Sequence, residues 1–223
     1  MSDPDQVSPD HWRPLSEGSA LLAPLALAGV AALRWYPSAA PLAFLAAAAA
    51  GVAFAFRDPP RDVLVDPAIA FSPADGRVIH MGLVHDEYWD REMLEVGIFL
   101  ALWDVHVQRV PIAGEIVAQR RKAGGYRPPM TEAATHGNNQ FATYLQTASG
   151  PCTVTQISGL VARRILTWAA AGDRVAQGDR LGMIKFGSQV TLRVPRTATT
   201  LVSVGDGVRA GLSPIFGLAP TEE

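Results

Sequence analysis

Residues 172–182 have the sequence Gly-Asp-Arg-Val-Ala-Gln-Gly-Asp-Arg-Leu-Gly, and their pattern of turns indicates the fold. Gly-Asp pairs followed by alternating apolar and polar residues are typical of tight turns that join short strands. A second phrase of the same kind, Ser-Pro-Ala-Asp-Gly-Arg-Val, occupies residues 72–78. Both phrases favour a small β sandwich or barrel.

The sequence around these phrases continues the β pattern. Short segments rich in Val, Ile, Leu and Thr lie between turn residues, and only residues 86–91 suggest a helical period. Residues 57–223 are therefore predicted to form one mostly β domain. The expected strands are residues 77–81, 94–100, 114–118, 141–146, 153–157, 189–194 and 200–204.

The first 56 residues have a different character. Residues 1–18 are polar and acidic, which predicts a mobile tail. Residues 19–33 and 41–56 carry no charge, and the turn Arg-Trp-Tyr-Pro-Ser at residues 34–38 has the composition of a membrane interface. Each apolar run is shorter than the roughly 20 residues that cross a hydrocarbon core squarely.

We therefore expect residues 19–56 to form a helical hairpin that anchors the chain in the cell membrane, either within one leaflet or across the bilayer. The alternative is a pair of helices buried in a soluble core. The charged sequence Arg57-Asp58-Pro59-Pro60-Arg61 ends the second run, and its arginines favour the cytoplasmic side.

Composition excludes several classes of protein. Of the 223 residues, 48% are hydrophobic and 18% are charged, which excludes wholesale disorder. The formal net charge of −2 argues against a general nucleic-acid-binding surface. The one cysteine, Cys152, excludes an internal disulfide framework, and Lys122 and Lys185 are the only lysines that could form a Schiff base.

Common catalytic signatures are missing from the sequence. It contains no Gly-x-Ser-x-Gly, His-Glu-x-x-His or Cys-x-x-Cys motif, and its five histidines show no metal-ligand spacing. We therefore expect no metal site and no serine-hydrolase site.

The Gly187-Ser188 pair is the candidate for less common chemistry. A serine after a glycine in a constrained turn can direct its hydroxyl at the preceding carbonyl, because glycine has no side chain to obstruct the approach. An N-to-O acyl shift followed by β-elimination would cut the chain there and convert Ser188 into a pyruvoyl group. Most Gly-Ser pairs are ordinary turns, so the pair alone does not indicate catalysis and the surrounding motifs must be considered.

Four motifs occur in order around this pair. They are Phe-Arg-Asp-Pro-Pro-Arg at 56–61, Ser-Pro-Ala-Asp-Gly at 72–76, Asp-Val-His-Val-Gln-Arg-Val-Pro at 104–111 and Gly-Met-Ile-Lys-Phe-Gly-Ser at 182–188. Together with the paired apolar runs, they resemble the short bacterial and archaeal form of phosphatidylserine decarboxylase, a pyruvoyl enzyme. The resemblance covers the chain from about residue 19 to residue 210.

The resemblance implies a proenzyme that cuts itself between Gly187 and Ser188, into a β chain (1–187) and an α chain (188–223). The pyruvoyl group made from Ser188 would form a Schiff base with phosphatidylserine and release phosphatidylethanolamine after loss of carbon dioxide. His106 would donate the proton that quenches the carbanion, and Asp75 would act as base or orienter in the cleavage.

Two arginines, Arg109 and Arg127, are candidates for binding the lipid phosphate, because a guanidinium offers a planar fork to phosphate. Each candidate also has a structural alternative: a turn former for Asp75, a hydrogen-bonded structural residue for His106, and a solvated charge for each arginine.

Arg109 stands where longer bacterial relatives carry a second histidine for the cleavage, so His106 serves either one role or both. An archaeal ether-lipid substrate fits the same motifs. The sequence leaves the oligomeric state open, so a homo-oligomer is one of the possible partners.

A membrane-tethered biotinyl or lipoyl carrier without catalysis is the alternative function. The phrase Gly-Asp-x-Val-x-x-Gly-x-x-Leu-Gly at residues 172–182 also resembles the turns of such domains. Carriers present their modified lysine at an exposed hairpin tip, whereas Lys185 lies beside the Gly-Ser pair. Cofactor mass on a lysine would indicate the carrier, and two fragments would indicate the decarboxylase.

Overall fold

The computed structural model describes residues 23–24, 26–32, 34, 39–127, 135, 137–159, 164–184 and 188–219. The chain divides into two compact units, Met1–Pro59 and Pro60–Glu223.

The first unit is helical. A first helical segment includes residues 26–32, and helix α2 spans Ala39–Ala55. The segments pack against each other at Gly29, where an added Cβ would collide with the side chain of Leu45. The paired helices expected for residues 19–56 are thus present in the described residues.

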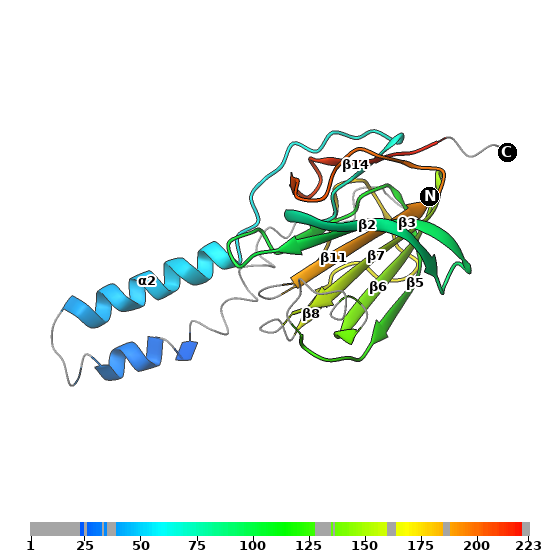
Figure 1. Cartoon of the computed structure of the whole chain (residues 1–223). Helices are drawn as coiled ribbons and strands as arrows, with labels where there is room; N and C mark the ends of the chain where they lie inside the picture. Colours follow the sequence, from blue (N-terminus) through cyan, green and yellow to red (C-terminus); the bar gives the residue numbers. More distant parts are fainter. Residues whose placement is uncertain are drawn as a thin grey trace. The chain divides into compact units, whose positions relative to one another are not determined.

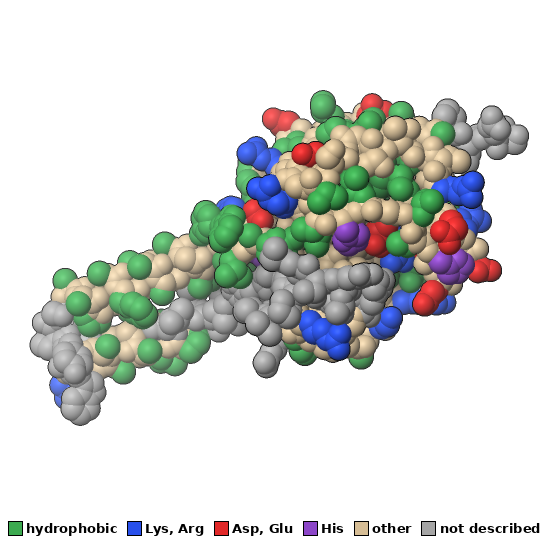
Figure 2. Space-filling model, in the orientation of Figure 1, with side chains coloured by type: hydrophobic (Ala, Val, Ile, Leu, Met, Phe, Trp, Pro, Cys, Tyr) green, Lys and Arg blue, Asp and Glu red, His purple; other side chains and the backbone are tan. Residues whose placement is uncertain are grey.

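The outer surface of this unit is apolar. Figure 2 shows hydrophobic side chains along both helical segments, and α2 has no buried residue. Among the described residues, no helix combines the length and the hydropathy needed to cross a membrane.

The second unit is built on a curled eight-stranded antiparallel sheet (Figure 1). In spatial order its strands are β13 (Gly207–Val208), β2 (Gly76–Asp86), β3 (Arg91–Leu100), β11 (Ser188–Pro195), β7 (Gly150–Ser158), β6 (Gln140–Thr147), β5 (Gly114–Lys122) and β9 (Arg174–Val175).

Two smaller sheets complete this unit. One has the order β4 (Val107–Arg109), β10 (Arg180–Ile184), β8 (Ile165–Thr167), and the other has the order β1 (Ile69–Phe71), β14 (Pro214–Gly217), β12 (Thr199–Thr200). The mostly β prediction is confirmed for this unit.

All but one of the predicted strands are found. Residues 200–204 contribute only the end of β12. The helical expectation for residues 86–91 is wrong, because residues 87–90 form the turn between β2 and β3. The carboxylate of Asp86 accepts the N–H groups of Tyr88 at 3.0 Å and Trp89 at 3.3 Å, and this local bonding stabilises a turn in place of a helix.

The Gly-Asp phrases form tight turns, as predicted. The carboxylates of Asp173, Asp179 and Asp206 each accept the N–H of the residue three positions earlier, at 2.7–2.8 Å. The glycine before each aspartate has a positive φ of 95°, 87° or 100°, which explains why glycine stands there.

Alternation along β11 separates the two faces of the large sheet. Val190, Leu192 and Val194 belong to the hydrophobic core, so Ser188 lies on the core face as well. Gln189, Thr191 and Arg193 lie on the opposite face. Cross-strand partners share a face, which places Gln156 and Ser158 of β7 on the core face beside Val190 and Ser188.

Candidate active site

Ser188 is the first residue of β11 and pairs with Leu100 of β3 on one side and Ser158 of β7 on the other. Its side chain is fully buried, and its Oγ has no hydrogen-bond partner among the described residues. An unpaired buried hydroxyl costs about 1–3 kcal/mol, so such a group calls for a functional explanation. Its predicted partner in cleavage, Gly187, lies outside the described residues.

Several strand ends meet around Ser188. Strands β3 and β7 end beside it, and β2 and β6 begin there because the sheet is antiparallel (Figure 1). We call this edge of the sheet the Ser188 end. Residues that immediately precede or follow these strands are thereby brought together, although they are far apart in the sequence.

His106 is linked to the Ser188 end through β10. The N–H of Ile184, four residues before Ser188, donates to the His106 carbonyl at 3.2 Å. His106 is 1% exposed, and its Nδ1 lies 2.8 Å from the carbonyl oxygen of Asp104. Because a carbonyl only accepts, Nδ1 carries a proton, and Nε2 is the basic nitrogen of the neutral ring.

Two buried glutamines connect His106 to the strand beside β11. Gln108 Nε2 donates to the His106 carbonyl at 2.8 Å, and Gln156 Nε2 donates to Gln108 Oε1 at 2.8 Å. The remaining oxygen of Gln156, Oε1, has no partner among the described residues. Both glutamines lie in stretches that the resemblance covers, but their residue type alone indicated no role.

Asp75 lies directly before β2 and is held by an arginine. Arg61 Nη1 and Nη2 donate to the two carboxylate oxygens, each at 2.7 Å, and the N–H of Ala210 donates to Oδ1 at 2.8 Å. Only β3 separates Asp75 from Ser188 at this end, which corresponds to roughly 10 Å. Arg61 was not predicted as a site residue, because it was identified only as the last residue of the charged motif at 56–61 and was given no role of its own.

Arg127 also reaches the Ser188 end. Its backbone N–H donates to Asn138 Oδ1 at 2.8 Å, and its carbonyl accepts from Asn138 Nδ2 at 2.9 Å. The same Nδ2 donates to the carbonyl of Ser158, the strand partner of Ser188, at 2.7 Å. Arg127 is exposed, and its guanidinium lies near Gly137.

Arg109 is the last residue of β4. It pairs with Arg180, at the other end of β10 from Ile184, about 13 Å along the strand. Its side chain is 7% exposed, and Nη1 donates to the Gly178 carbonyl at 2.9 Å. The structure therefore brings Ser188, His106, Asp75 and Arg127 to one end of the sheet. Arg109 pairs with the far end of β10, and its backbone N–H donates to the carbonyl of Pro73, two residues before Asp75, at 2.9 Å.

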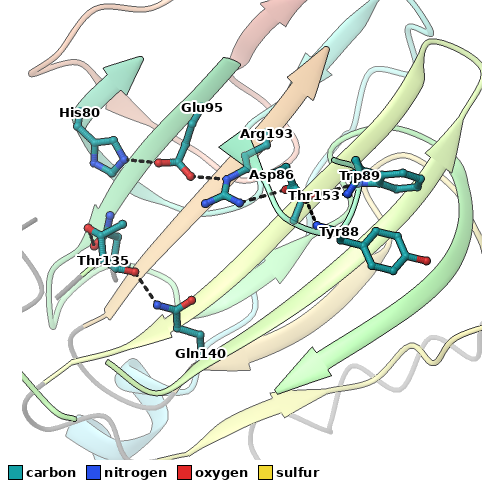
Figure 3. Close-up of polar contacts among 10 residues, drawn as sticks. His80, Asp86, Tyr88, Trp89, Glu95, Thr135, Gln140, Thr153 and Arg193 are labelled. Atoms are coloured by element: carbon teal, nitrogen blue, oxygen red, sulfur yellow. Dashed lines mark hydrogen bonds and ion pairs between the residues drawn. The ribbon is translucent and has the colours of Figure 1, made fainter. Parts of the chain in front are cut away.

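A polar network lies on the opposite face of the sheet (Figure 3). His80 Nε2 donates to Glu95 at 2.9 Å, and Arg193 donates to Glu95 at 2.6 Å and to Asp86 at 3.0 Å. Burial opposes the charge on Glu95, but the His80 hydrogen bond and the Arg193 charge outweigh it and lower the pKa of Glu95. The network connects β2, β3 and β11 and so stabilises the strand that begins with Ser188.

Comparison with known proteins identifies close relatives. The sequence model of the family described as phosphatidylserine decarboxylase matches residues 49–215, which include all the predicted site residues. A protein of Methanopyrus kandleri named as an archaetidylserine decarboxylase proenzyme is 37% identical over 220 residues, which cover 94% of this chain and 98% of that protein.

Two bacterial relatives are named phosphatidylserine decarboxylase proenzyme. That of Geotalea uraniireducens is 38% identical over 170 residues, covering 76% of this chain and 79% of the relative. That of Burkholderia mallei is 38% identical over 156 residues, covering 70% of this chain and 72% of the relative.

Proposed function

The chain belongs to the phosphatidylserine decarboxylase family, and we propose that it makes its catalytic group from Ser188 by cutting its own backbone between Gly187 and Ser188. Its reaction is the decarboxylation of phosphatidylserine to phosphatidylethanolamine. Membership of this family of enzymes favours the decarboxylase over the biotinyl or lipoyl carrier. The observation that carries the proposed cleavage is the buried Ser188 hydroxyl, unpaired among the described residues, at the start of β11.

The proposed cleavage takes place in three steps. Ser188 Oγ attacks the Gly187 carbonyl carbon, and the peptide C–N bond breaks as an ester forms. β-Elimination then breaks the Cβ–Oγ bond and leaves Gly187 with a free carboxylate. Water hydrolyses the remaining enamine to a pyruvoyl group and ammonia. The unpaired Oγ supports this sequence, because no other described group competes for the hydroxyl.

The residues around Ser188 suit the decarboxylation that follows. A pyruvoyl ketone supplies an electron sink for the carbanion that remains when carbon dioxide leaves. The His106 ring, oriented by the Asp104 carbonyl, would take up a proton on Nε2 and donate it from the imidazolium form to quench the carbanion. Arg127, exposed at the Ser188 end, would bind the lipid phosphate.

Mass spectrometry and carbonyl labelling test the cleavage. The wild-type protein should give two chains, with a blocked, carbonyl-reactive end at position 188. Ser188→Ala should remain one chain of 23.7 kDa without activity. The matched control is Ser158→Ala, which removes a hydroxyl from the adjacent strand and should still cleave. An active, full-length Ser188→Ala protein would refute the proposal.

Membrane attachment through residues 19–56, on the cytoplasmic side, is the second part of the proposal. The unburied apolar surface of α2 and the lipid nature of the substrate support it. Detergent-free fractionation of the full chain and of a chain beginning at Asp58 tests it. If both proteins stay in the soluble fraction, this attachment is wrong.

A further inference from the structure

A tight turn at residues 101–104 carries two exposed apolar side chains. The N–H of Ala101 donates to Asp104 Oδ2 at 2.8 Å, and the N–H of Asp104 donates to the Ala101 carbonyl at 3.0 Å. These bonds close the turn at its base. Leu102 and Trp103 form its tip and are 53% and 69% exposed.

The turn does not require large residues at its tip. The same aspartate-to-N–H bond closes the turns at residues 170–173, 176–179 and 203–206. In each of those turns glycine stands where Trp103 stands here. Leu102 and Trp103 therefore expose two adjacent apolar side chains that the turn geometry does not explain, and they are the candidates for an interaction surface.

The position of the turn connects it to the active site. It directly follows Leu100, the strand partner of Ser188, and it ends two residues before His106. Tyr126, which is 40% exposed, lies next to Arg127 at the same end of the sheet. Lys122 is also exposed. It pairs with Gln140, which pairs through Ile157 with Gln189, so Lys122 lies at the same end of the sheet as Ser188.

We propose that Leu102, Trp103 and Tyr126, together with Lys122 and Arg127, form a lipid-docking edge that seats the Ser188 end on an anionic bilayer. Aromatic and aliphatic side chains beside cations suit the headgroup region of such a membrane. The proposal rests on the proposed function, because a lipid substrate presents its headgroup at that depth. It adds a contact made by the β unit to the attachment proposed for residues 19–56.

An environment-sensitive fluorophore at position 103 tests the docking directly. Cys152 is fully buried, so Trp103→Cys would offer the one accessible thiol of the folded chain. The full chain is used with Ser188→Ala and with vesicles of phosphatidylcholine and phosphatidylglycerol, so the signal depends on neither cleavage nor turnover. The matched control is Leu83→Cys, which is 61% exposed and lies about 20 Å along the sheet from Leu100.

We expect the fluorophore at position 103 to shift to the blue and to be quenched by spin-labelled lipids, and the fluorophore at position 83 to show neither effect. Vesicles of phosphatidylcholine alone should give a weaker shift at position 103. No shift at position 103, as for a surface that binds a protein partner, would overturn the docking edge. An equal shift at both positions would also overturn it.

A kinetic comparison provides the second test. The double variant Leu102→Ser/Trp103→Ser should lose about tenfold more kcat/KM on phosphatidylserine in vesicles than on a monomeric short-chain phosphatidylserine. Leu83→Ser should show no such difference. Equal losses on both substrates would assign the turn to the catalytic site and overturn docking. If the wild-type chain decarboxylates neither substrate, the proposed function fails, while the fluorescence test still decides the docking edge.

Discussion

Arg61 and Asp75 form a bidentate ion pair in which each guanidinium Nη lies 2.7 Å from a carboxylate oxygen. Arg61 Nη1 also donates to the Ala210 carbonyl at 2.6 Å, and the Ala210 N–H donates to Asp75. Both side chains are largely buried, with 6% and 14% exposed. Since both oxygens of Asp75 already accept hydrogen bonds, we expect Asp75 to orient the cleavage site through its fixed charge.

Substitution of Arg61 tests that expectation. Arg61→Leu should destabilise the fold by about 3–5 kcal/mol, because it leaves a buried carboxylate without its partner. Uncleaved precursor should accumulate, and the measurement is the fraction of cleaved chain on a denaturing gel over time. Arg61→Lys is the matched control. Its ammonium group keeps the positive charge but cannot form the bidentate pair, so this variant should cleave at an intermediate rate. Wild-type cleavage in Arg61→Leu would show that the ion pair is not needed.

Substitution of His106 should separate cleavage from decarboxylation. His106→Ala should lower kcat by about 10²–10⁴-fold, the usual contribution of general acid–base catalysis. If His106 serves decarboxylation alone, the variant still appears as two chains. If it also takes the role of the second histidine, which Arg109 replaces here, precursor accumulates as well. A cleaved variant with wild-type kcat would exclude His106 as the proton donor.

The glutamine pair should affect catalysis through His106. Gln108→Leu removes the donor to the His106 carbonyl and leaves Gln156 unpaired, at a cost of about 1–3 kcal/mol. We expect lower kcat in Gln108→Leu and in Gln156→Leu, with a double variant little worse than either one, because the residues act as one chain. Gln119→Leu, which removes a side-chain bond to the Ala169 carbonyl at 3.0 Å, is the control. Fully additive losses would show that the two glutamines act separately.

Acid should weaken the network around Glu95. Its folded-state pKa is lowered, so its contribution to stability is fully present above the ordinary glutamate pKa of about 4.3 and is lost as pH falls through the lower folded value. Melting temperatures between neutral pH and acid, measured on Ser188→Ala protein to keep one chain, should fall less steeply in Glu95→Gln than in its parent. Parallel curves would show that Glu95 does not contribute to acid unfolding.

Arg193 is the cation of the same network, and its removal should be costly at neutral pH. Burial opposes its charge, but Glu95 and Asp86 outweigh that effect and raise the pKa of Arg193. Arg193→Met should destabilise the fold by about 3 kcal/mol, because two buried carboxylates lose their partner. The measurement is the melting temperature on the Ser188→Ala background. Arg196→Met, at an exposed position after the end of β11, is the control and should change little.

Local patterns predicted most of the strands and turns. Residues 189–194 alternate apolar and polar side chains, and the structure has β11 there with the apolar set in the core. The Gly-Asp turns were equally predictable, since the aspartate bonds to a backbone group three residues away. Residues 86–91 were predicted wrongly because the same local bonding, from Asp86, outweighs their weak helical period.

The family, the mostly β unit, the paired apolar helices and the Gly187-Ser188 pair could all be predicted from the sequence, because they depend on residue order and on short-range periodicity. The three-dimensional arrangement was needed to show that Arg61 pairs with Asp75, that Gln156 and Gln108 hold the His106 backbone, and that Arg127 is bonded through Asn138 to the strand partner of Ser188. Gln108 and Gln156 are 48 residues apart. Such contacts follow from strand order, register and the face on which each side chain lies, and none of these is a property of the local sequence.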